Sequence, residues 1–177
     1  MYAAFNTLML LGTLQGFIMC GLLFFSHKNK YANRLLGILI LLITLAVLNM
    51  YLSGLSRLPA IIRFSLNFLP LIIVMPVGPL IYFYVRSVTD PDFRLRRQDR
   101  RHFWPVVVDV VPQLIALVFV GGVMAGIFAN NGRPWGEFID TYNVYADIPR
   151  WASITGYLFF AYRHLAGFNL AKDRLKW

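Results

Sequence analysis

The chain has 177 residues, of which 58% are hydrophobic and only 14% are charged, and its mean hydropathy is +0.60. A soluble domain of this length would have too little polar surface to cover itself, so the composition argues against a soluble protein. The formal net charge of +9 does not indicate nucleic-acid binding, because the basic residues lie just outside apolar runs and are not interleaved with aromatic residues on a polar face.

Four runs without a charged residue divide the chain, and they predict membrane-spanning helices. Each run has at least 22 residues, which at about 1.5 Å per helical residue is enough to cross a hydrocarbon core of about 30 Å. We therefore expect helices over these runs, in chain order. The predicted helices cover residues 4–25, 35–53, 61–85 and 105–128.

The last apolar run, residues 151–162, is too short to cross a membrane by itself. We expect this fifth helix to begin near Tyr145, with Asp147 and Arg150 paired three residues apart near the outer surface. The predicted fold class is all-α, a polytopic transmembrane helical bundle of about five spans. No linker divides the chain, so residues 1–177 are expected to form a single domain.

The Lys and Arg residues between the runs alternate between many and few, and this pattern sets the predicted orientation. Residues 26–34 and 86–104 carry three and six of them, whereas residues 54–63 and 129–150 carry two each. Positive charge is retained on the cytoplasmic side during insertion, so we expect the N-terminus outside and the C-terminus inside. The predicted location is the inner, cytoplasmic membrane, crossed several times.

The basic loop after the third predicted helix contains a helix start signal. Thr89 or Asp90 can cap a helix whose first residue is Pro91, with Asp92 in its first turn. Such a helix would be strongly basic and is a candidate site for anionic lipid or a cytoplasmic partner. The alternative is a juxtamembrane segment whose only role is orientation. The candidate binding residues are Arg94, Arg96, Arg97, Arg100 and Arg101.

Proline and glycine mark the third predicted helix and two possible packing faces. Pro76, Gly78 and Pro79 should bend the helix, either as a hinge or as a static kink, because prolines leave backbone carbonyls without partners. Glycines four residues apart allow helices to approach closely, within one chain or in a homodimer. Such pairs are Gly12 with Gly16 and Gly122 with Gly126.

Asp109 is the only acid inside an apolar run, and buried carboxylates in membranes usually mark a function or a partner. Its predicted depth near the inner border makes Arg163 and His164 its candidate partners, and hydration at the interface is the alternative. The histidines are not at ligand spacing, so we expect no metal or haem site. The sequence has no nucleophile with a base, no paired carboxylates and no phosphate loop, so we expect neither an enzyme nor a cofactor.

Two segments carry a family resemblance. Residues 78–105 read GPLIYFYVRSVTDPDFRLRRQDRRHFWP, and residues 11–42 read LGTLQGFIMCGLLFFSHKNKYANRLLGILILL. Both resemble the N-terminal membrane region of bacterial membrane-anchored AraC-type transcription regulators. The residues that anchor the resemblance are Gly78, Pro79, Tyr84, Arg86, Ser87, Asp90, Phe93, His102 and Pro105.

In that family a multi-helix membrane region precedes a cytoplasmic helix-turn-helix DNA-binding domain. The resemblance implies a sensory or anchoring input domain that would reach DNA only through a C-terminal domain absent from these residues, and it implies no ligand residues. The basic ending, residues 171–177, has no stop signal, so we expect the native chain to continue. The rival interpretations are a small transporter or channel subunit, with Asp109 on the pathway, and a structural membrane assembly module.

Overall fold

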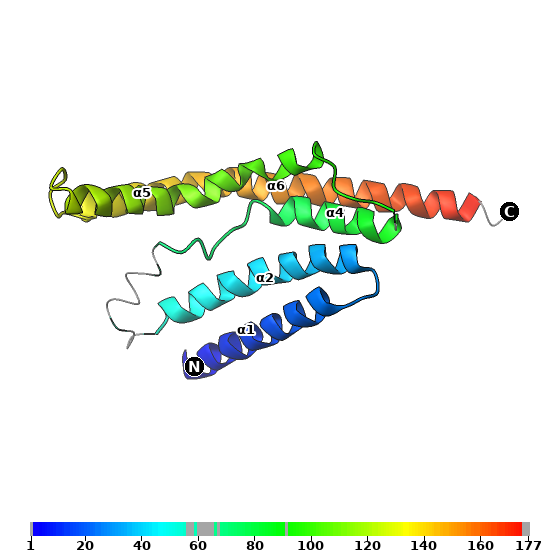
Figure 1. Ribbon diagram of the computed structural model, residues 1–177, viewed down its shortest axis with the longest axis horizontal. Helices are drawn as coiled ribbons and strands as arrows, with labels where there is room; N and C mark the ends of the chain where they lie inside the picture. Colours follow the sequence, from blue (N-terminus) through cyan, green and yellow to red (C-terminus); the bar gives the residue numbers. More distant parts are fainter. Residues whose placement is uncertain (1, 56–58, 60–65, 67, 91, 175–177) are drawn as a thin grey trace.

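The computed structural model describes residues 2–55, 59, 66, 68–90 and 92–174, and within them every regular element is a helix (Figure 1). The predicted all-α class is therefore confirmed. Among the described residues, three helices are long and apolar enough to cross a membrane: Ala4–Phe25, Lys30–Ser53 and Asp99–Met124. The elements are α1 (Tyr2–Phe25), α2 (Lys30–Ser53), α4 (Val77–Thr89), the 3₁₀-helix η1 (Asp99–Val106), α5 (Val107–Met124) and α6 (Arg133–Arg174).

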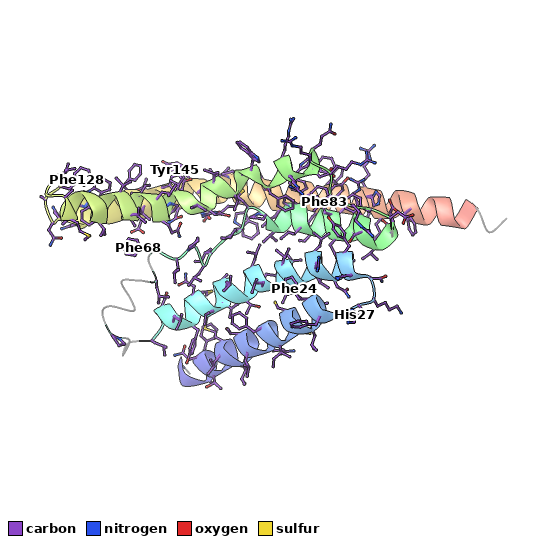
Figure 2. The ribbon with its side chains drawn as sticks, in the orientation of Figure 1. Phe24, His27, Phe68, Phe83, Phe128 and Tyr145 are labelled. Atoms are coloured by element: carbon purple, nitrogen blue, oxygen red, sulfur yellow. The ribbon has the colours of Figure 1, made fainter. Side chains whose placement is uncertain are left out.

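Helices α1 and α2 form an antiparallel hairpin, with small residues at their contact (Figure 1). A side chain at Gly16 would overlap Thr44, so the two helices approach closely there. Nearer the turn, the ring of Phe24 packs over Gly37, where a Cβ would lie 3.3 Å from it (Figure 2). The turn itself is held by Asn33, whose side-chain amide donates to the carbonyl oxygen of Lys28 at 2.7 Å.

The prediction of a third helix over residues 61–85 is wrong for many of the residues that the structure describes in this range. Residues 70–74 have no regular secondary structure, a turn follows, and α4 begins only at Val77. Pro70 and Pro76 explain the break, because neither can donate a hydrogen bond to a continuing helix. Pro79 is compatible with the new helix because it falls in the first turn, where a backbone donor has no partner within the helix. Residues 60–65 and 67 of the prediction lie outside the described residues.

The predicted helix start in the basic loop is also wrong where it can be compared. Pro91 is outside the described residues, but residues 92–98 carry no helix, and the first helical turn is the 3₁₀-helix that begins at Asp99. Asp99 itself accepts a hydrogen bond from the backbone N–H of Arg96 at 2.7 Å, which fixes the start of η1. The chain passes from η1 directly into α5.

Helix α6 begins twelve residues before the predicted start near Tyr145, and its 42 residues extend about 63 Å at about 1.5 Å per residue. The predicted start was too late because it was based on the charge-free run, whereas a helix can also contain charged residues such as Glu137 and Asp140. Pro134 suits the first turn, and Arg133 binds Glu137 at 2.9 Å one turn later. Figure 1 shows α6 running antiparallel to α5 and then alongside α4 in the same direction as that helix.

A cluster of buried apolar side chains joins α2, α4 and the basic loop. Phe83 of α4 is 1% exposed and stacks on Phe93 of the loop, with ring centroids 6.0 Å apart (Figure 2). Leu35 of α2 and Leu80 complete the cluster. The guanidinium of Arg86 lies 4.4 Å from the centre of the Phe93 ring, so the loop is fixed against the bundle by both burial and a cation–π contact.

Candidate functional site

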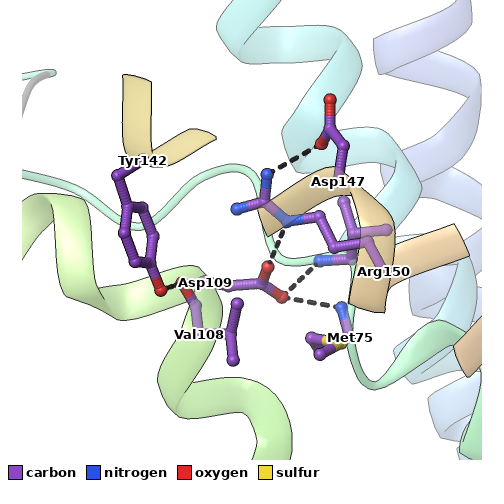
Figure 3. A network of polar contacts seen from close by, with 7 residues as sticks. Met75, Val108, Asp109, Tyr142, Asp147 and Arg150 are labelled. Carbon is purple, nitrogen blue, oxygen red and sulfur yellow. Dashed lines mark hydrogen bonds and ion pairs between the residues drawn. The ribbon is translucent and has the colours of Figure 1, made fainter. Parts of the chain in front are cut away.

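Asp109 lies in the first turn of α5, and its side chain is buried at 1% exposure for the whole residue. One carboxylate oxygen accepts hydrogen bonds from the backbone N–H groups of Val74 and Met75, at 2.7 and 2.6 Å. The other accepts from Nε of Arg150 at 2.8 Å (Figure 3). The backbone N–H groups of Val74 and Met75 are not part of a helix and need acceptors from elsewhere. The carboxylate of Asp109 provides these acceptors.

Arg150 comes from α6 and lies between two carboxylates. Its side chain is 10% exposed, and besides Asp109 it binds Asp147 at 3.0 Å, one turn earlier on the same helix (Figure 3). The Asp147–Arg150 pair predicted from sequence spacing is thus confirmed. Both oxygens of Asp109 have partners, and the guanidinium is shared by two acids, so this polar network is well satisfied despite its burial.

The prediction that Arg163 or His164 is the partner of Asp109 is wrong. Because α6 begins at Arg133, it is Arg150 that lies beside the first turn of α5. His164 instead forms a 2.9 Å hydrogen bond through Nε2 with the hydroxyl of Thr89, at the end of α4. Arg163 is exposed near the same end of the molecule.

A second contact reinforces the pairing of α5 with α6. The hydroxyl of Tyr142 donates to the carbonyl oxygen of Val108 at 2.9 Å, next to Asp109 in the chain (Figure 3). Farther along the hairpin, the ring of Trp135 lies 5.4 Å from that of Phe119. The Asp109–Arg150 network therefore lies between the α5–α6 hairpin and the non-helical residues 70–74.

The candidate hinge residues lie where α4 meets α6. A Cβ at Gly78 would lie 3.0 Å from the ring of Tyr157 and 3.1 Å from the carbonyl oxygen of Ser153. Pro76 precedes α4 as its first flanking residue, and Pro79 is buried in its first turn. These three residues thus mark a close helix contact next to the polar network.

The five candidate arginines of the basic loop fall into two groups. Arg97, Arg100 and Arg101 line one depression together with Trp104, which is 77% exposed. Arg94 and Arg96 line another, whose walls include acidic residues of the same loop. The guanidinium of Arg94 also lies 5.2 Å from the centre of the Tyr31 ring. The first group is the more strongly basic surface.

The two glycine pairs differ in what they contact. Gly16 faces Thr44 of α2, whereas no atom lies within 4 Å of a Cβ built on Gly12. The prediction of a helical Gly122–Gly126 step is wrong, because α5 ends at Met124 and Gly126 has a φ of +71° in the following turn. Gly122 packs on the ring of Phe128, which folds back from this turn.

Sequence reasoning did not identify Arg150 as the partner of Asp109. It also did not predict that the backbone N–H groups of residues 74 and 75 bind the same carboxylate. A usable signal was present, because several prolines in one apolar run predict backbone groups that need partners from elsewhere. Within the described part of the chain, no cluster of three His, Cys, Asp or Glu residues is arranged to hold a metal ion. No family model, curated protein or solved structure matches the chain.

Proposed function

We propose that this chain is the membrane-embedded sensory and anchoring input region of an AraC-type transcription regulator. The segments 11–42 and 78–105, which resemble that family, support the assignment. The observation that carries it is the continuity of α6, because the helix that contributes Arg150 to the buried network runs unbroken to Arg174. In Figure 1 its C-terminal end extends beyond α2 and α4.

This helix can pass on a change in the bundle. From Arg150 to Arg174 it extends about 36 Å, and a shift of the polar network would move its far end as a rigid rod. A stimulus can bring about such a shift only by binding two arrangements of the bundle with different affinity. A DNA-binding domain outside these residues would read the position of α6.

The proposed topology has five spans, with the N-terminus outside and the cytoplasmic membrane as the location. The spans are α1, α2, the broken segment that ends in α4, η1 with α5, and α6. The alternation of Lys and Arg supports this arrangement. In Figure 1 the turn after α1 lies toward one end of the bundle and the α5–α6 turn lies at the other, as opposite membrane sides require.

Two further partners are proposed. The basic surface of Arg97, Arg100 and Arg101 suits anionic lipid headgroups, and the exposed Trp104 beside it suits the membrane interface. Gly12, which faces open space, is a candidate contact for a second copy of the chain.

The function is tested by attaching a DNA-binding domain that activates its reporter gene only as a dimer, directly after residue 174. We expect reporter output in the parent fusion, and a several-fold change in output for Asp109→Asn at equal membrane abundance. Asp147→Asn, which removes the same charge at a 60% exposed side chain, is the matched control. Equal output from all three fusions would reject the sensory role.

A small transporter is the second candidate, because a discontinuous span beside a polar network is also found at transporter substrate sites. Transport requires access from both membrane sides. Uptake of a substrate into proteoliposomes, lost in Asp109→Asn, would favour this candidate over the regulator.

A further inference from the structure

A cavity of about 970 Å³ lies beside the Asp109–Arg150 pair, and its described walls come from the end of α2, Leu66, residues 68–72, α5 and the first half of α6. In the proposed topology it belongs to the outer half of the bundle. One face of α5 and one face of α6 line the cavity, because the lining residues of each helix recur every three or four residues. On α6 these include Gly136, Asp140, Asn143 and Arg150.

The described lining of the cavity carries more acidic than basic side chains, in a chain whose net charge is +9. Among these described residues, the carboxylates are those of Asp109 and Asp140, and the guanidinium is that of Arg150. The positive charge of Arg150 is also balanced from outside the cavity by Asp147 at 3.0 Å. The basic residue nearest along α6, Arg133, is paired with Glu137. A cation that enters the cavity beside Asp140 is therefore attracted by its carboxylate.

The remaining lining groups suit an amphipathic molecule. The side-chain amides of Asn49, Gln113 and Asn143 offer hydrogen bonds, and most other lining side chains are apolar. Trp135 and Phe119 present aromatic rings 5.4 Å apart on the two helices. Cavities of this size with apolar walls and a few polar groups are typical of small-molecule sites, and aromatic faces attract cations.

We propose that this cavity binds an organic cation, an amine or quaternary ammonium carried on an apolar or aromatic body. Its charged group is bound by the carboxylate of Asp140, and its body packs against Trp135 and Phe119. The Asp109–Arg150 network forms the floor, so a bound cation is positioned to alter the contact between α5, α6 and the broken span. The assignment deepens the proposed function, since it names the class of stimulus.

The test is direct binding to the full chain in nanodiscs of zwitterionic lipid, with the aromatic cation rhodamine 6G as probe and fluorescence anisotropy as readout. We expect saturable binding above that of empty nanodiscs and none for the anionic dye fluorescein. Asp140→Asn should weaken binding at least fivefold. Glu137→Gln, which removes the same charge one turn earlier and outside the cavity lining, should change it less than twofold.

A second pair of variants tests the location. Ala116 lines the cavity on α5, whereas Leu117 beside it is 61% exposed on the outer surface. Ala116→Phe should fill the cavity and abolish binding, and Leu117→Phe should leave it intact. Binding no tighter than to empty nanodiscs, or equal effects within either pair, would overturn the assignment.

These outcomes are distinct from those of the reporter fusion. Loss of cation binding with an intact reporter response to Asp109→Asn would reject the ligand class and keep the regulator. Saturable binding that depends on Asp140, with no reporter response, would keep the cavity and reject the regulator.

Discussion

Asp109 is the residue at which three segments of the chain meet. Replacing it with leucine would leave the guanidinium of Arg150 with one acid instead of two and would remove the acceptor for the N–H groups of Val74 and Met75. Removing one partner of a buried ion pair typically costs about 3–5 kcal/mol. We therefore expect Asp109→Leu to lower the free energy of unfolding by about that amount, measured by thermal or denaturant unfolding in detergent.

Two controls separate the network from charge loss in general. Asp147→Asn should cost about 1 kcal/mol or less, because the side chain of Asp147 is 60% exposed. The double variant Asp109→Leu with Arg150→Met should recover part of the loss, since it leaves no charge buried without a partner. A single Asp109→Leu variant as stable as the parent would contradict the assigned role.

The prediction that a basic residue binds Asp109 is confirmed, but the basic residue is Arg150 and not Arg163 or His164. Composition identifies Asp109, because it is the one acid inside an apolar run. Its partner depends on the relative depth of two helices, and that depth depends on where α6 begins. Because Arg133 and Glu137 made the start of α6 resemble a loop, Arg150 was assigned to the opposite membrane border.

At the scale of the helix, close packing of α1 on α2 rests on Gly16. A side chain there would overlap Thr44, whose hydroxyl is held by the carbonyl oxygen of Ile40 at 2.7 Å and whose β-branch restricts rotation. We expect Gly16→Leu to force the helices apart and to destabilise the protein by about 1–3 kcal/mol. Thermal unfolding in detergent measures the effect.

Gly12 is the matched control, because it lies one turn away on the same helix and no atom lies within 4 Å of its built Cβ. Gly12→Leu should leave the unfolding temperature of the monomer unchanged. Equal destabilisation by the two variants would contradict the packing of α1 against α2 at Gly16. Loss of a dimer only in the Gly12 variant would support the proposed contact between copies.

The third predicted span illustrates which features of an element the sequence can predict. The prolines predict a bend near residues 75–79, whereas the structure has a non-helical segment at residues 70–76 and a helix from Val77. They do not determine whether the helix bends or breaks, because that depends on acceptors from another helix. Asp109 provides these acceptors to Val74 and Met75, so a non-helical segment is stable where a helix was expected.

For the whole molecule, the apolar composition was enough to predict the class. Among the described residues, α1, α2 and the continuous η1–α5 helix are long and apolar enough to cross a membrane. The cavity could not be predicted in this way, because its walls come from segments far apart in the sequence. Asn49 and Asp140, for example, are brought to the same cavity only by the tertiary arrangement.

Orientation can be tested with single cysteines, because Cys20 is the only cysteine in the sequence and is buried. In a Cys20→Ala background, we expect a membrane-impermeant maleimide to label Asn130→Cys in intact cells, since residue 130 lies in the turn between α5 and α6. Arg97→Cys, in the basic loop, should be labelled only after the membrane is permeabilised.

The reverse labelling pattern would contradict the orientation and change where the cavity opens. The cavity lies on the same side of Asp109 as the α5–α6 turn, because Phe119, Gly132 and Trp135 line it. With that turn outside, an organic cation reaches the floor of the cavity from the cell exterior, and α6 carries the response toward the cytoplasm. With the turn inside, the same carboxylates would face a cytoplasmic ligand, and the end of α6 would lie on the opposite side from DNA. The labelling of these two positions therefore decides whether the cavity and α6 can work together as a sensor of external molecules.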